Sequence, residues 1–339
     1  MSTLQVIWFL LIGVLLTGYA ILDGFDLGVG FWHLFTRKSD DRRTLMNTIG
    51  PVWDGNEVWL LTGGGALFAA FPHVYATVFS GLYLPLMVVL FALIFRAVSL
   101  ESRSKVDSPG WRRTWDIAFG LGSIIPGLLF GVAVGNILRG LPLDASKNFE
   151  GTLLGLLNPY SLLFGVVGLS MFATHGALYA WAKTSGDLSE SMRKKARAAW
   201  YVFFLLFLIA SAYTIFTQPH LVANWNKLPP LFVVLFIALF FMLLTRAYIR
   251  RGQSAKAFTA SCLGVVGVMA INAVSLFPNL VPALNDPKLN LTIANSSSSP
   301  LTLRTMLIIA IVGMPIVLGY SLWAHKTFGG KIETGSEVY

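Results

Sequence analysis

Residues 50–59 read Gly-Pro-Val-Trp-Asp-Gly-Asn-Glu-Val-Trp and open an apolar segment of the chain. Asp54 and Glu57 lie at its start, although an ionised side chain deep in a bilayer helix costs about 3 kcal/mol. The preceding apolar segment carries Asp23 and Asp26 at the same i,i+3 spacing, which sets each pair on one face of a helix. Four acids on two consecutive apolar helices therefore indicate a polar seam inside a membrane protein.

The composition supports the same class. Hydrophobic residues make up 55% of the 339 residues, charged residues only 12%, and the mean hydropathy is +0.68. Such a chain is too apolar to stay in water, so we predict an integral membrane protein. Cys262 is the only cysteine, which excludes an internal disulfide and a thiolate metal cluster. The net charge of +9 does not indicate nucleic acid, because the basic residues gather in short connections between apolar segments.

Apolar stretches of about 20 residues, the length that crosses a bilayer as a helix, recur along the whole chain. We expect one polytopic all-α membrane domain over residues 1–339, grouped as two four-helix bundles and one peripheral helix. The nine predicted spans are residues 4–35, 52–71, 74–98, 114–138, 158–183, 198–217, 230–249, 257–280 and 305–328.

Basic residues alternate between the connections. Arg37, Lys38, Arg42 and Arg43 follow the first span, whereas no Lys or Arg separates the second span from the third. Because basic connections stay in the cytoplasm, we predict an N-terminus outside and a cytoplasmic C-terminus. Tryptophans near the cytoplasmic span ends predict an interfacial belt, with Trp53 left open as a donor to a buried acceptor; they are Trp32, Trp53, Trp111, Trp115, Trp181, Trp200 and Trp323.

In this orientation Asp23, Asp26, Asp54 and Glu57 all fall in the cytoplasmic half, where they can form one cluster. Carboxylates held together in a low dielectric titrate as a coupled group, as a proton relay requires. The alternative is structural: Asp23 and Asp26 at the headgroup level, and Asp54 capping its helix.

Other polar residues near the span ends permit several roles. Arg96 is either a boundary residue whose charge reaches the interface, or the partner of a carboxylate or of a haem propionate. Asp116 is expected to be a charge at a helix N-terminus. Of the five histidines only His175 lies deep in a span, and we expect it to make a polar contact between helices. The histidine spacing offers no haem or metal site in this chain.

These residues resemble subunit II of the prokaryotic cytochrome bd quinol oxidases. The resemblance covers mainly the first half of the chain, whereas beyond Pro159 it is chiefly one of hydropathy. The matching stretches are Leu22-Asp-Gly-Phe-Asp-Leu-Gly-Val-Gly30, Trp53-Asp-Gly-Asn-Glu-Val-Trp-Leu60, Gly64-Gly-Ala-Leu-Phe-Ala-Ala70, Gly131-Val-Ala-Val-Gly-Asn136 and Leu156-Leu-Asn-Pro159.

The resemblance implies a complex in the prokaryotic cytoplasmic membrane. Its subunit I carries haem b and haem d, oxidises quinol and reduces dioxygen to water, so that a proton-motive force arises. Subunit II ligates no haem, has no catalytic residue or metal of its own, and supports assembly. It also contributes to a cytoplasmic proton path, with Asp54 at the entry and Trp53 near the subunit interface. Some members hold a quinone as a structural lipid, and small single-helix accessory subunits are further expected partners.

Our leading hypothesis is therefore the haem-free subunit of a bd-type oxidase, with Asp54, Asp23, Asp26 and Glu57 as its proton path. A stand-alone proton-coupled transporter is the alternative, although no acid lies beside the prolines that would break its helices, which are Pro85, Pro126 and Pro315. A purely structural partner is the third hypothesis.

Overall fold

The computed structural model describes residues 1–333, in which helices account for most of the chain. Two short strands, β1 (Asn279–Val281) and β2 (Leu291–Thr292), pair antiparallel in the connection before the last helix. The α-helices are α1 (Thr3–Leu34), α2 (Ser39–Ile49), α3 (Trp53–Ala70), α4 (Pro72–Gly81), α5 (Tyr83–Ser102), α6 (Pro109–Arg139), α7 (Leu153–Leu156), α8 (Pro159–Lys183), α9 (Gly186–Thr217), α10 (Pro219–Lys227), α11 (Phe232–Arg250), α12 (Ser254–Leu276) and α13 (Pro300–Thr327).

Eight helices in residues 1–333 are long and apolar enough to cross a membrane, which confirms the all-α membrane class. Helix α3, the second expected span, is not among these eight. Its first turns carry Asp54, Asn56 and Glu57, and these side chains lower its hydropathy. The spanning helices are α1, α5, α6, α8, α9, α11, α12 and α13.

Several boundaries differ from the expected ones. The expected span over residues 74–98 is interrupted at Leu82, so that α4 ends at Gly81 and the long helix α5 begins at Tyr83. The connection after the first span contains the short helix α2. It was not predicted, because its sequence is largely polar and the prediction rested on apolar stretches. Helix α9 begins at Gly186, well before residue 198, because its first turns are polar and extend the helix beyond the apolar stretch.

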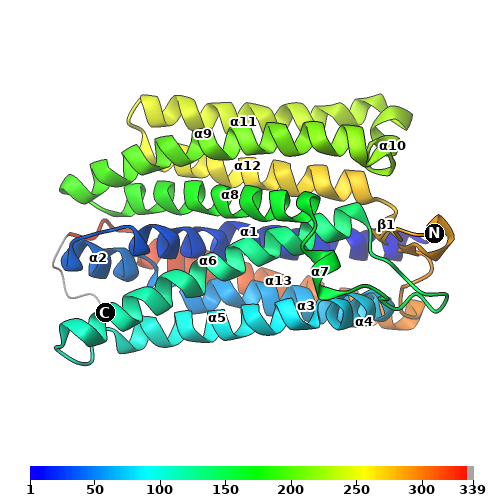
Figure 1. Ribbon diagram of the computed structural model, residues 1–339, viewed down its shortest axis with the longest axis horizontal. Coiled ribbons are helices and arrows are strands. Elements are labelled where there is room, and N and C mark those ends of the chain that lie inside the picture. The colour runs from blue at the N-terminus through cyan, green and yellow to red at the C-terminus, as the bar shows by residue number, and fades with distance from the viewer. Residues whose placement is uncertain (334–339) are drawn as a thin grey trace.

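Helices α1, α6 and α8 pack against one another in the middle of the bundle (Figure 1). Helices α3, α5 and α13 lie on one side of this centre, and α9, α11 and α12 lie on the other. The N-terminus and β1 lie at one end of the bundle, and α2 lies at the opposite end. Residues that end α1 therefore meet residues of α2, α5 and α6 at the end where α2 lies.

Helices α1 and α8 cross with their backbones in contact. A Cβ atom on Gly28 would lie 1.9 Å from the carbonyl oxygen of Phe172, and a Cβ atom on Gly176 would lie 2.3 Å from the carbonyl carbon of Gly28. Only glycine permits this approach, as is common where membrane helices pack through small residues. Gly28 follows Asp23 by five residues and Asp26 by two, so the crossing fixes the position of both carboxylates.

The tryptophan belt was predicted for too many residues. Trp181 and Trp200 are buried in the hydrophobic core. The indole of Trp200 donates to the carbonyl oxygen of Met242 at 2.9 Å. The belt prediction is therefore wrong for these two residues, which hold α8, α9 and α11 together.

Candidate functional site

Asp23 of α1 and Arg96 of α5 form an ion pair in the interior of the bundle. Arg96 Nη1 donates to Asp23 Oδ2 at 3.0 Å, and Nη2 donates to Oδ1 at 2.5 Å. Both residues have 0% exposure. Two parallel hydrogen bonds between a guanidinium and a carboxylate fix both distance and direction. Of the roles left open for Arg96, the structure therefore places it with a carboxylate and away from the surface.

Asp26 lies beside this pair without being fully engaged by it. Arg96 Nη2 is 3.7 Å from Asp26 Oδ2, and Asn56 of α3 donates to the same oxygen at 2.8 Å. The other carboxyl oxygen, Oδ1, has no hydrogen-bond partner within residues 1–333. Asp26 is also 0% exposed. The structure thus brings Asp23, Asp26, Asn56 and Arg96 together; we call these four residues the inner cluster.

The two acids of α3 lie farther out. Glu57 is half-buried, within electrostatic reach of Arg96 and Asp23, whereas Asp54 is exposed. The expected single cluster of four acids is therefore spread from the surface of α3 to the interior. Three residues along a helix turn a side chain through about 300°, so Asp54 and Glu57 lie about 60° apart on one face of α3, but Glu57 is the one of the two within electrostatic reach of Arg96 and Asp23. Asn56 is the residue of this stretch that faces Asp26, and sequence analysis missed it.

A second polar centre, which sequence analysis also missed, surrounds Asp116 of α6. Its carboxylate accepts hydrogen bonds from Arg42 Nη1 at 2.8 Å and from Arg103 Nε at 2.5 Å. His33 Nε2 lies 2.8 Å from the same carboxylate, and His33 Nδ1 lies 3.2 Å from the carbonyl oxygen of Arg42. Helix α6 begins at Pro109, so Asp116 lies beyond its first turn and the interpretation as a charge at a helix N-terminus is wrong; the side chain is also only 3% exposed. It joins α1, α2, α5 and α6.

Four of the five histidines, namely His33, His175, His220 and His325, contact polar groups of the protein. His175 Nδ1 lies 2.8 Å from Ser261 Oγ, and Nε2 lies 3.0 Å from the carbonyl oxygen of Ile21. The expected polar contact between helices is confirmed. His220 Nε2 and His325 Nδ1 each contact one backbone carbonyl oxygen, and the buried His325 Nε2 has no hydrogen-bond partner within residues 1–333. Among the described residues, no three His, Cys, Asp or Glu side chains come together as metal ligands. Both ring nitrogens of His33 and of His175 have polar partners, so these two imidazoles do not fit axial ligation of a haem.

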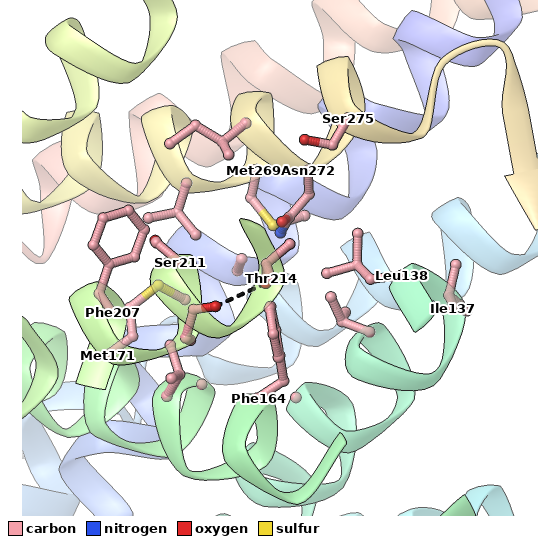
Figure 2. Close-up of a pocket in the computed structure, with 18 of the residues that line it drawn as sticks. Ile137, Leu138, Phe164, Met171, Phe207, Ser211, Thr214, Met269, Asn272 and Ser275 are labelled. Carbon is pink, nitrogen blue, oxygen red and sulfur yellow. Dashed lines mark hydrogen bonds between the residues drawn. The ribbon is translucent and has the colours of Figure 1, made fainter. Parts of the chain in front are cut away.

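A cavity of about 530 Å³ lies between the middle of the bundle and the helices α9 and α12 (Figure 2). Its walls are almost entirely apolar. Phe164 and Met171 of α8, and Phe207 of α9, are among the lining residues. A few polar side chains join them, namely Tyr19, Ser211, Thr214, Asn272 and Ser275. An apolar cavity of this kind suits an apolar ligand with a small polar group.

Fold and site together define a polytopic helical membrane protein with a buried ion pair and an apolar cavity. The chain belongs to the family described as cytochrome bd terminal oxidase subunit II, which matches residues 4–328. It is therefore a subunit of an oxidoreductase complex and a multi-pass protein of the inner membrane.

Individual relatives agree with this assignment. The chain is 37% identical to the probable cytochrome oxidase subunit 2 of Haemophilus influenzae, over 97% of this chain and 95% of the relative. It is also 37% identical to the cytochrome bd-I ubiquinol oxidase subunit 2 of Escherichia coli K12, over 98% and 96%. In fold it resembles a chain in the structure of bd oxidase from Geobacillus thermodenitrificans, with a TM-score of 0.80, 18% identity, and 96% and 99% coverage.

Proposed function

We propose that this chain is the haem-free subunit of a bd-type quinol oxidase and pairs with a subunit I that carries haem b and haem d. In this complex subunit I oxidises quinol and reduces dioxygen to water, and the chain described here supports its assembly and delivers protons from the cytoplasm. The membership of the subunit II family supports the pairing. The imidazoles of His33 and His175, in which both ring nitrogens have polar partners, support the placement of the haems in the partner.

The observation that carries the proton path is the graded burial of the four acids. Asp54 is exposed, Glu57 is half-buried, and Asp26 and Asp23 are fully buried. A proton entering at Asp54 meets Glu57 one turn later on the same helix, and the inner cluster lies behind Glu57. Ionisable residues inside a membrane helix are costly and are retained mostly for such transfer.

The exposed face of α3 is our proposed contact with subunit I. It mixes an acid, a threonine and glycines with apolar residues, a composition that lipid solvates poorly. Trp53 is half-buried at the cytoplasmic edge of this face, where a partner subunit would cover it. The exposed residues of the face are Asp54, Gly55, Val58, Leu61, Thr62, Gly65 and Phe68.

The apolar cavity is our proposed site for a quinone held as a structural lipid. Its apolar walls suit a polyprenyl tail, and Asn272, Ser275 and Thr214 offer polar contacts to a head group. The surrounding helices come from both sides of the molecule, so a bound quinone would fill the space between them and support the fold.

The proposed topology has nine spans, with α3 as the ninth, and the four-four-one grouping of helices. The N-terminus lies outside and the C-terminus in the cytoplasm. A variant with Cys262→Ala accepts single cysteines at Ser2 and Asp41 for labelling by an impermeant thiol reagent. Intact cells oriented this way should be labelled at position 2 and not at position 41. The reverse result would invert the topology.

Asp54→Asn tests the proton path. In the assembled oxidase we expect lower oxygen consumption with unchanged haem content, because the amide cannot carry a proton. Asp107→Asn is the matched control, since Asp107 lies in a connection and its side chain is 90% exposed. Unchanged oxygen consumption by a fully assembled Asp54→Asn complex would remove Asp54 from the path.

The transporter alternative finds no support in the fold. It requires helices broken near the middle of the membrane, with the coupling acid at the break. Helix α6 continues through Pro126 and α13 continues through Pro315. The inner cluster contains none of these prolines.

A further inference from the structure

The inner cluster has one positive charge for two carboxylates. Asp23 takes both Nη groups of Arg96, whereas Asp26 has only the longer 3.7 Å contact. If both acids were ionised, one negative charge would stay uncompensated at a place with 0% exposure. Burying an unpaired charge is among the most costly arrangements in a protein, and a proton or another cation must therefore balance it.

No neighbouring side chain in residues 1–333 supplies that balance. Helix α3 presents Asn56, which is neutral, and Glu57, which is a further acid. From α8, Tyr179 is the nearby titratable group, and it donates its hydroxyl to the carbonyl oxygen of Thr48. Asp26 Oδ1 is the carboxyl oxygen of the inner cluster for which the described residues provide no partner.

We propose that Asp26 holds a proton and is a neutral acid in the resting protein, next to a fixed Asp23–Arg96 ion pair. The two acids then have different tasks. Asp23 anchors Arg96, and Asp26 carries the exchangeable proton, with Asn56 holding its Oδ2. A metal cation is disfavoured in this place because the guanidinium 3.7 Å from Oδ2 repels it. The use of this proton in turnover rests on the proposed proton path, whereas the protonation rests only on the buried charges.

Infrared spectroscopy of the assembled oxidase tests the protonation directly, because a protonated carboxyl group has a C=O stretch that a carboxylate lacks. We expect the difference spectrum of parent minus Asp26→Asn to contain one such band, shifted in deuterium oxide. Parent minus Asp107→Asn should contain none, since that side chain is 90% exposed and pairs with Arg112 at 2.6 Å. If the Asp26→Asn variant retains every C=O band of the parent, the proposal is overturned.

Two charge-conserving variants assign the band and remain informative if the amide variant does not assemble. Asp26→Glu should move the C=O band, and Asp23→Glu should leave it in place. If the band moves only in Asp23→Glu, the protonated acid is Asp23, which would refute the assignment to Asp26. If the parent has no such band and its thermal stability depends on sodium or potassium rather than choline, a bound metal cation replaces the proton.

Oxygen consumption measured on the same samples separates this inference from the proposed function. If Asp26→Asn loses the C=O band but consumes oxygen at the parent rate, Asp26 is protonated as proposed. Asp26 is then not part of the proton path. If Asp26→Asn slows turnover but leaves the C=O band intact, the protonated acid is another residue. The proton path then still depends on Asp26, but not as a neutral acid at rest.

Discussion

The guanidinium of Arg96 donates two hydrogen bonds to Asp23, although 73 positions of the chain separate the two residues. This contact links α1 to α5 inside the bundle. Asp26 and Asn56 complete the surroundings, so that three helices meet at one charged group. The arrangement determines which substitutions the interior tolerates.

Arg96→Gln should be strongly destabilising, because it leaves the Asp23 carboxylate buried without its cation. Removing one partner of a buried ion pair costs about 3–5 kcal/mol. We expect a lower yield of assembled oxidase and a lower midpoint of thermal unfolding in detergent. The double variant Asp23→Asn with Arg96→Gln should recover part of the loss, since it removes both charges. A double variant as unstable as the single one would show that Arg96 acts independently of Asp23.

Asp116→Ala removes the acceptor shared by Arg42, Arg103 and His33. Three cationic or potentially cationic groups then face one another at the junction of α1, α2, α5 and α6, and we expect a loss of about 3–5 kcal/mol. The measurement is thermal unfolding of the purified complex. Asp107→Ala serves as the control and should change stability by less than about 0.5 kcal/mol. Equal stability of the two variants would contradict the role given to Asp116.

Gly176→Leu should separate α1 from α8. Even a Cβ atom at this position would lie 2.3 Å from the backbone of Gly28, so the helices must move apart and displace Asp23 and Asp26. We expect little assembled protein after membrane extraction. Gly13→Ala is the matched control in α1, because no atom lies within 4 Å of an added Cβ there. Normal assembly of Gly176→Leu would show that the crossing can be loosened.

Ala210→Phe should reduce the amount of quinone bound in the apolar cavity. Ala210 is 3% exposed and lines the cavity, so a phenyl ring at this position occupies space that the proposed quinone needs. Solvent extraction of the purified oxidase, followed by chromatography, measures quinone per haem. Leu208→Phe, at a site with 44% exposure, adds a ring on the outer surface and should leave the ratio unchanged. Equal quinone in both variants would place the lipid elsewhere.

The sequence was sufficient for the helical membrane class and for the idea of a polar seam. Acids at positions 23, 26, 54 and 57 stand out because apolar helices rarely contain them. Their partners were harder to predict, since Arg96 is distant in the chain and its position at the end of an apolar run also fits a boundary residue. Asn56 carried the one overlooked signal, as a buried amide in an apolar segment also needs a partner.

The Asp116 centre was beyond prediction for a different reason. Its partners His33, Arg42 and Arg103 come from three separate segments whose basic residues all resemble ordinary cytoplasmic connections. Only the packing of α1 against α6 shows which of these residues turn inward. The interruption at Leu82 was equally hidden, because hydropathy stays high across α4 and α5 and does not record a change of direction.

Helix α3 is a poor candidate for unassisted entry into the bilayer during synthesis. Its polar first turns weigh against partitioning by the translocon, which judges each segment largely by its own apolar content. The helices α1 and α5 are much more apolar, with mean hydropathies of 2.1 and 2.2 over their best windows. They can insert first and allow α3 to insert as part of a helical hairpin. In the proposed nine-span topology, insertion of α3 would therefore depend on its neighbours, and a copy without its partner subunit would leave Asp54 exposed on its surface.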